Sequence, residues 1–148
     1  MAGPANLLGI KLLITGSRKL QAAETAELIE KGLAALQEQG HPAPTLLLHG
    51  GAAGADTWAE TWAQGQGLKT EAVLPDYGQY EGEAALLERN KVLAAKADTA
   101  LALYARGRWR QGGTWDTAQK VIALGKPLLE MEARSDKMHY TPAPMTLF

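Results

Sequence analysis

Apolar residues along this chain fall into two alternating patterns: short unbroken runs, and longer stripes that recur every three or four positions. An unbroken run rich in Leu, Ile and Val is typical of a parallel strand covered on both faces. A stripe at three-to-four spacing predicts a helix with one buried face. The runs predict five strands, at residues 10–14, 45–48, 71–74, 99–104 and 126–131. The stripes predict four helices, at about residues 22–39, 55–66, 83–96 and 114–124.

Strands and helices alternate strictly in this prediction, with short connections between them. That order implies an α/β fold in which a parallel sheet carries helices on both faces. Right-handed crossovers make the sheet doubly wound, with strand order 3-2-1-4-5, and ligands bind such sheets outside the carboxyl ends of the strands, near the switch point between the first and fourth. We expect a single such domain over residues 10–132, after a lead-in of residues 1–9 and before a tail of residues 133–148.

The tail is polar at first and then rich in proline. Two interpretations are open. Either the tail is disordered, as polar and proline-rich segments often are, or it docks on a partner subunit through Met145, Leu147 and Phe148.

Composition removes several classes of function. The chain has 15 basic and 16 acidic residues and a net charge of −1, whereas proteins that bind nucleic acid through its backbone usually carry a basic excess. It has no cysteine, and its three histidines lie far apart, so we expect no metal site. No apolar run approaches the ~18 residues of a membrane span, and the N-terminus lacks the pattern of a signal peptide. We therefore expect a cytoplasmic protein with no membrane association.

The most informative loop follows the second predicted strand, at residues 49–56, and reads HGGAAGAD. Its glycines let the backbone come close to another group, and the helix that follows directs unpaired N–H groups and the positive end of its dipole toward the loop. Such a turn suits an anion, typically phosphate, although it is also typical of a tight connection with no ligand. Asp56 either caps the helix or serves the ligand, by holding a ribose hydroxyl or by orienting Arg18 or Arg89.

Two further loops belong to the same predicted rim. Residues 15–18 (TGSR) bring a hydroxyl and a guanidinium whose fork suits phosphate, or they simply cap a helix and face solvent. Residues 112–114 (GGT) open the fourth predicted helix, with Thr114 as its expected N-cap, and aim a second helix N-terminus at the same crevice. The preceding loop carries three cations that either cover an anionic ligand or face solvent, Arg106, Arg108 and Arg110.

Five short motifs together carry a resemblance to a known family: 14–18 (ITGSR), 49–56 (HGGAAGAD), 89–90 (RN), 112–114 (GGT) and 125–127 (GKP). Over about residues 10–131 the chain resembles the SLOG superfamily of Rossmann-like domains, and within it the small YspA/YpsA-related branch. That superfamily also contains the LOG phosphoribohydrolases, described as lysine decarboxylase-like, and the DprA/Smf DNA-processing proteins. The resemblance implies a nucleotide or nucleotide-derived ligand on the rim, and a homodimer.

The resemblance to the LOG enzymes is incomplete at the position that matters for catalysis. In the LOG enzymes, an arginine and the glutamate of a PGGxGTxxE motif together cut the N-glycosidic bond of a nucleoside monophosphate, and the resemblance implies the same reaction here. Arg89 falls at the position of that arginine, whereas Thr117 occupies the glutamate position when the motifs are aligned on Gly113 and Thr114. The reaction needs a carboxylate to stabilise positive charge or to activate water, and the candidate is the neighbouring Asp116, whose reach is shorter.

We therefore predict that the chain binds a nucleotide-derived, phosphoribosyl-type ligand as a sensor or carrier, without a cofactor. The alternative is a LOG-like phosphoribohydrolase, with Arg89 on the phosphate and Asp116, or else Asp56, as its catalytic carboxylate. A further alternative, DprA-like binding of single-stranded DNA, requires a basic groove at the arginine loop with Trp109 as an aromatic platform. The predicted ligand contacts are Gly16, Ser17, Arg18, Gly50, Gly51, Gly54, Ala55, Asp56, Asn90, Gly112, Gly113 and Thr114.

Overall fold

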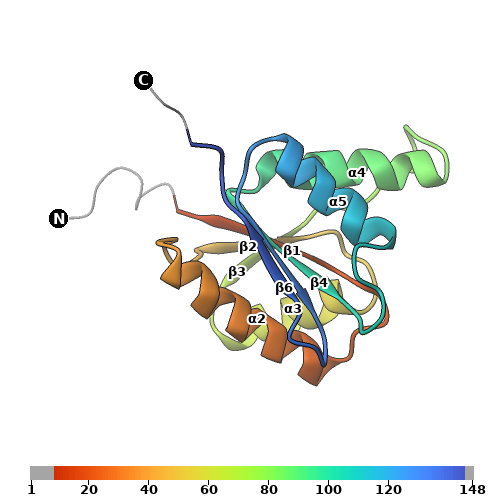
Figure 1. Cartoon of the computed structure of the whole chain (residues 1–148). Helices are drawn as coiled ribbons and strands as arrows, with labels where there is room; N and C mark the ends of the chain where they lie inside the picture. Colours follow the sequence, from red (N-terminus) through yellow and green to blue (C-terminus); the bar gives the residue numbers. More distant parts are fainter. Residues whose placement is uncertain (1–8, 146–148) are drawn as a thin grey trace.

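The computed structural model describes residues 9–145 (Figure 1). Strands and helices alternate up to the fifth strand, and a short sixth strand follows. The elements in chain order are β1 (Lys11–Gly16), α2 (Ala22–Glu38), β2 (Leu46–His49), α3 (Ala55–Gly65), β3 (Lys69–Ala72), α4 (Glu83–Lys96), β4 (Thr99–Tyr104), α5 (Gly112–Ala123), β5 (Leu128–Glu132) and β6 (Met138–Thr141). None of the helices within residues 9–145 is long and apolar enough to cross a membrane.

The strands form one sheet in the order β3-β2-β1-β4-β5-β6. The first five strands pair in parallel, which confirms the predicted doubly wound α/β fold and its strand order. Since β1 pairs with both β2 and β4, the switch point lies between the loops that follow β1 and β4. Those loops frame the site described below.

The helices cover the two faces of the sheet in pairs, with α2 and α3 on one face and α4 and α5 on the other (Figure 1). Alternate residues of the central strands enter the two cores. In β4, for example, Leu101 and Leu103 pack on the α2–α3 side, whereas Ala100 and Ala102 pack on the α4–α5 side. Both faces of a strand are therefore apolar, which explains the unbroken runs seen in the sequence.

The sheet has six strands where the sequence predicted five. Residues of β6 pair antiparallel with β5, with Leu129 opposite Tyr140, and the Tyr140 hydroxyl lies 2.7 Å from Nε2 of His41. The strand was missed because it is short and lies at the sheet edge, so its side chains are only partly buried or exposed. Of the predicted tail contacts, Met145 is 85% exposed, while Leu147 and Phe148 lie outside the described residues.

The third strand is displaced from its predicted position. It covers Lys69–Ala72 rather than residues 71–74, and the Leu74 side chain, expected inside the strand, is 65% exposed. At this sheet edge the register is set by main-chain pairing with β2, from Leu46 opposite Lys69 to His49 opposite Ala72. Apolar content is therefore a poor guide to the bounds of this strand.

Candidate functional site

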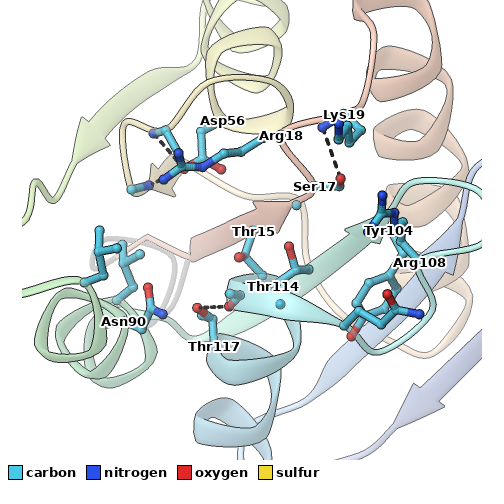
Figure 2. Close-up of a pocket in the computed structure, with 18 of the residues that line it drawn as sticks. Thr15, Ser17, Arg18, Lys19, Asp56, Asn90, Tyr104, Arg108, Thr114 and Thr117 are labelled. Carbon is cyan, nitrogen blue, oxygen red and sulfur yellow. Dashed lines mark hydrogen bonds between the residues drawn. The ribbon is translucent and has the colours of Figure 1, made fainter. Parts of the chain in front are cut away.

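A pocket of about 380 Å³ opens at the carboxyl ends of β1, β2 and β4, where the topology predicts a ligand site (Figure 2). Figure 2 shows Arg18 and Asp56 on one wall of the pocket and Thr114 and Thr117 on another. Residues from α4 line it as well. The predicted contacts that line this pocket are Gly16, Ser17, Arg18, Gly50, Asp56, Asn90, Gly112, Gly113 and Thr114, together with the predicted catalytic residue Arg89.

The loop after β1 is fixed by its own backbone. The amide of Ser17 donates to the carbonyl of Leu103 on β4 at 2.9 Å, and the Ser17 hydroxyl accepts the amide of Lys19 at 3.1 Å. These bonds use the amide and hydroxyl of Ser17 and the amide of Lys19. The side chains of Arg18 and Lys19 are left at the pocket wall. Lys19 was not among the predicted contacts, although it follows the TGSR motif directly.

The glycine loop after β2 is closed upon itself. One carboxylate oxygen of Asp56, Oδ2, accepts the amides of Gly50 at 3.0 Å and Ala52 at 3.2 Å, and Nδ1 of His49 accepts the amide of Gly51 at 3.0 Å. Burial raises the pKa of Asp56, while these amide bonds and His49 act to lower it. The amides predicted to hold phosphate are thus bound to side chains of the same loop.

Three glycines of the predicted site serve close packing. A Cβ on Gly16 would lie 2.5 Å from the Cβ of Ala55, and a Cβ on Gly54 would lie 2.5 Å from backbone atoms of Arg18. A Cβ on Gly50 would lie 2.5 Å from the guanidinium of Arg89. These positions let the first two loops and α4 approach one another. Gly51, Gly54 and Ala55 do not themselves line the pocket.

His49 supports the closed loop and does not line the pocket. It is 3% exposed, and its Nε2 lies 3.0 Å from Oε1 of Glu60 on α3. Because Nδ1 accepts the Gly51 amide, Nε2 carries the proton and donates to Glu60. These contacts give His49 a structural role in the loop.

The N-terminus of α5 is open. The helix begins at Gly112, two residues before its predicted start, so Thr114 lies in the first turn and is not the N-cap. As in any helix, the first amides have no acceptor within the helix, and in the described chain no side chain caps those of Gly112, Gly113 and Thr114. A Cβ on Gly112 or Gly113 would meet no atom within 4 Å. These amides therefore lie at the pocket without a side-chain acceptor in the described chain.

The side chain of Arg89 is held at two points. Its Nε donates to Oδ1 of Asn90 at 2.9 Å, and its Nη1 donates to the carbonyl of Gly50. Burial lowers the pKa of Arg89, Asp56 opposes that change, and Arg18 adds to it. Two arginines therefore repel each other at this pocket wall, an arrangement that an anion between them would relieve.

Asp116 does not line the pocket. Its Oδ2 accepts Nδ2 of Asn90 at 3.0 Å and forms an ion pair with Lys120 one helical turn away. The position predicted to replace the LOG glutamate thus faces α4. Thr117 does line the pocket, is 1% exposed, and donates its hydroxyl to the carbonyl of Gly113 at 3.0 Å.

The arginine loop divides into members with different surroundings. Arg108 lines the pocket, whereas Arg106 is exposed and does not. Arg110 binds the fully buried Glu130 through Nε at 3.0 Å and Nη2 at 2.8 Å. The Glu130 carboxylate also accepts the hydroxyl of Tyr104 at 2.8 Å, and burial raises the pKa of that tyrosine.

Glu130 and Tyr104 were not predicted as site residues. A glutamate inside a buried strand is unusual unless it is paired. The position of Glu130 within an apolar run could therefore have indicated a buried partner. The 125–127 motif lies away from the pocket, where Nζ of Lys126 donates to the carbonyl of Ala94 at 2.8 Å and that of Ala95 at 2.6 Å. No group of three metal-ligating side chains occurs within residues 9–145.

The charge of the lining is the clearest electrostatic feature of the pocket. Of the described residues that line it, four are cationic, Arg18, Lys19, Arg89 and Arg108, and one is anionic, Asp56. This excess of positive charge stands out in a chain whose net charge is −1. Clefts lined by one sign of charge concentrate ligands of the opposite sign.

Comparison with known proteins finds a family similar to the first half of the domain. Residues 10–80 match the model of the YspA, cpYpsA-related SLOG family. Over these residues, just under half of the chain, the protein is similar to that SLOG family. The resemblance expected from the motifs is therefore confirmed, and the matched segment carries the first two loops of the pocket. No curated protein is significantly similar to the chain in sequence.

Two solved structures share the fold of this chain. The X-ray structure of DNA processing protein A (DprA) from Streptococcus pneumoniae has a TM-score of 0.60 and 19% sequence identity, covering 84% of this chain and 50% of that one. The X-ray structure of TM1055 has a TM-score of 0.53 and 21% identity, covering 80% and 72%. The chain spans about half the length of the DprA chain. At these identities the likeness shows the fold alone.

Proposed function

We propose that this domain binds a phosphorylated, nucleotide-derived ligand in the pocket, as a sensor or carrier. The observation that carries the proposal is the lining: four cations and one carboxylate around a helix N-terminus with unpaired amides. Phosphate is the group that such amides and cations bind best. A volume of about 380 Å³ falls within the range of small-ligand sites.

The two ends of the pocket suit different parts of such a ligand. The amides of Gly112, Gly113 and Thr114 would hold the phosphate, since those of the first glycine loop are already bound within the loop. Asp56 uses Oδ2 for both of its amide bonds, and its Oδ1 has no donor in the described chain. An ionised carboxylate only accepts hydrogen bonds, so Asp56 suits a sugar hydroxyl and repels phosphate.

Hydrolysis of an N-glycosidic bond is the alternative that the pocket favours less. The LOG glutamate position is Thr117, which faces the pocket, and Asp116 does not line it. Asp56 is the pocket carboxylate, and two amides already engage it. A reaction that needs a free carboxylate has no good candidate among these groups.

Binding of single-stranded DNA also finds less support. The expected aromatic platform, Trp109, has Arg110 and Lys137 at 5.6 Å and 5.2 Å from its ring and Tyr104 at 5.1 Å between ring centroids. The ring of Trp109 thus already has three side chains beside it, and Arg110 is committed to Glu130. The homodimer and the cytoplasmic location stay predictions from the sequence.

Thermal unfolding with AMP, ribose 5-phosphate and adenosine tests the proposal. A ligand at 100 times its Kd adds about 2.7 kcal/mol to the free energy of unfolding. We expect AMP and ribose 5-phosphate to raise the Tm and adenosine to have little effect, because it lacks the phosphate. Chromatography after incubation should recover AMP intact. Released adenine would show the phosphoribohydrolase instead, and no shift with either phosphate would contradict the proposal.

Two arginines of one loop give a matched control. Arg108→Ala removes a cation from the pocket and should weaken AMP binding about tenfold, the size of one lost charge-assisted contact. Arg106→Ala removes an equal charge outside the pocket and should leave AMP binding unchanged. Equal losses in the two variants, with tight binding of a single-stranded oligonucleotide, would favour a nucleic-acid surface.

A further inference from the structure

We propose that Asp116 is a positioning residue, which holds the guanidinium of Arg89 at the pocket through the side chain of Asn90. The inference rests on the proposed binding function, because it explains how the pocket presents one of its four cations. It assigns Asp116 a role different from the catalytic one expected from the sequence.

The relay runs across three elements of the fold. Starting on α5, Lys120 pairs with Asp116, which accepts Nδ2 of Asn90 on α4 at 3.0 Å. The other end of that amide, Oδ1, accepts Nε of Arg89 at 2.9 Å. Arg89 finally donates through Nη1 to the carbonyl of Gly50, in the loop after β2.

The chemistry of the partners fixes the direction of this chain. A guanidinium only donates hydrogen bonds and an ionised carboxylate only accepts them, whereas an amide side chain does both. Asn90 is 5% exposed and lies between an obligatory donor, Arg89, and an obligatory acceptor, Asp116. Its amide therefore has one satisfied orientation, and in that orientation Nη2 of Arg89 is left for a ligand.

Arg89 needs these hydrogen bonds because its surroundings do not favour a charged guanidinium at this place. Its guanidinium is partly buried beside the like charge of Arg18, and like charges at short range repel. Without Asn90 the long side chain would keep only its bond to the carbonyl of Gly50 and could turn away from Arg18. Asp116 keeps the Asn90 amide from rotating, and Lys120 in turn holds Asp116. The relay therefore keeps a cation in the pocket while no ligand is present.

Substitutions of Asp116 separate positioning from catalysis. Asp116→Asn retains an oxygen that can accept Nδ2 of Asn90, so the affinity for AMP should stay within about threefold of the original chain. Asp116→Ala removes the acceptor and should weaken AMP binding about tenfold, the size of one lost contact to a charged group. In an Arg89→Lys background, which removes Nε, Asp116→Ala should cause little further loss.

A second readout needs no ligand. The Nε–H of Arg89, assigned by its loss in Arg89→Lys, should exchange slowly with solvent in NMR spectra of the free protein. Asp116→Ala should accelerate that exchange, and Asp116→Asn should restore it. Glu88→Ala is the control, since it removes a carboxylate from the same helix that pairs with Lys91 outside the relay; it should leave both readouts unchanged.

The two readouts distinguish failure of the relay from failure of the proposed function. If AMP, ribose 5-phosphate and adenosine all fail to bind, the proposed function fails, and the exchange of Arg89 Nε–H still decides the relay. If AMP binds and Asp116→Ala changes neither its affinity nor the exchange, the relay is overturned. Loss of AMP cleavage in Asp116→Asn with unchanged binding would also overturn it, because the carboxylate would then be catalytic.

Discussion

Two glycine-rich loops border the same pocket, and they use their backbone amides in opposite ways. After β2, the amides of Gly50, Gly51 and Ala52 donate to Asp56 and His49 of their own loop. Before α5, the amides of Gly112, Gly113 and Thr114 meet no capping side chain in the described chain. The first loop is a closed structural turn, and the second has open amides, where we propose that the anion binds.

The difference comes from the residues that follow the glycines. The first loop carries a carboxylate, Asp56, which reaches back to the amides and takes the place of an external anion. The second is followed by the hydroxyls of Thr114 and Thr117, and the Thr117 hydroxyl donates to the carbonyl of Gly113. Close backbone approach requires glycine in the first loop only, because a Cβ on Gly112 or Gly113 would meet no atom within 4 Å. The amides stay available where no carboxylate reaches back to them, since Asp116 turns to Asn90 on α4.

Replacing a glycine by alanine in each loop should give the largest difference in unfolding free energy between the two loops. Gly54 has φ +76, and a Cβ there would lie 2.5 Å from the backbone of Arg18. Gly54→Ala should cost about 3–5 kcal/mol of unfolding free energy, from the strained backbone and the overlap together. Gly113→Ala meets no atom within 4 Å and removes a helical glycine, so stability should rise by up to about 1 kcal/mol.

Urea denaturation measures both changes in unfolding free energy. AMP binding then tests whether the second loop holds the ligand. The methyl group of Gly113→Ala would lie beside the open amides, so AMP affinity should fall although the chain is more stable. A stable Gly54→Ala chain, or full AMP affinity in Gly113→Ala, would contradict the division of the loops into a closed turn and an anion site.

Removing the internal carboxylate should have the next largest effect. Asp56→Ala leaves the amides of Gly50 and Ala52 without their acceptor in a buried place, which should cost about 2–4 kcal/mol. Asp76→Ala is the matched control, because Asp76 accepts the amides of Gly78 and Gln79 at 3.0 Å and 3.2 Å in an exposed turn. Water replaces that carboxylate, so the loss there should stay below about 1 kcal/mol. Equal losses in the two variants would show that burial of the Asp56 bonds is unimportant.

The fold followed from the sequence because its central strands are apolar on both faces, as Leu101 and Ala102 illustrate on β4. At the sheet edges the bounds of β3 were misplaced and β6 was missed. Both strands are bounded by main-chain pairing with their neighbours rather than by apolar content. The loops around the pocket were predicted from topology alone. Most of the predicted contacts line the pocket. The exceptions depend on side-chain directions that sequence spacing does not give, as for Asp116, which turns to Asn90 on α4.

The smallest expected effect is the pH dependence of stability that Asp56 gives to the closed loop. Burial raises the pKa of Asp56 above its ordinary value of 3.8, so the folded chain binds this proton more tightly than the unfolded chain does. Between the two pKa values, stability therefore rises as the pH falls and is lost as the pH rises. Asp56→Asn keeps an acceptor for the two amides but does not titrate.

The difference in unfolding free energy between the original chain and Asp56→Asn isolates this group, because contributions from all other carboxylates cancel. Measured by urea denaturation from pH 7 down toward 3.8, that difference should move in favour of the original chain as the pH falls. A difference that moved the other way would mean that the amide bonds from Gly50 and Ala52 outweigh desolvation. The loop would then stabilise the ionised carboxylate, and the closed turn would be a stronger internal anion site than its burial indicates.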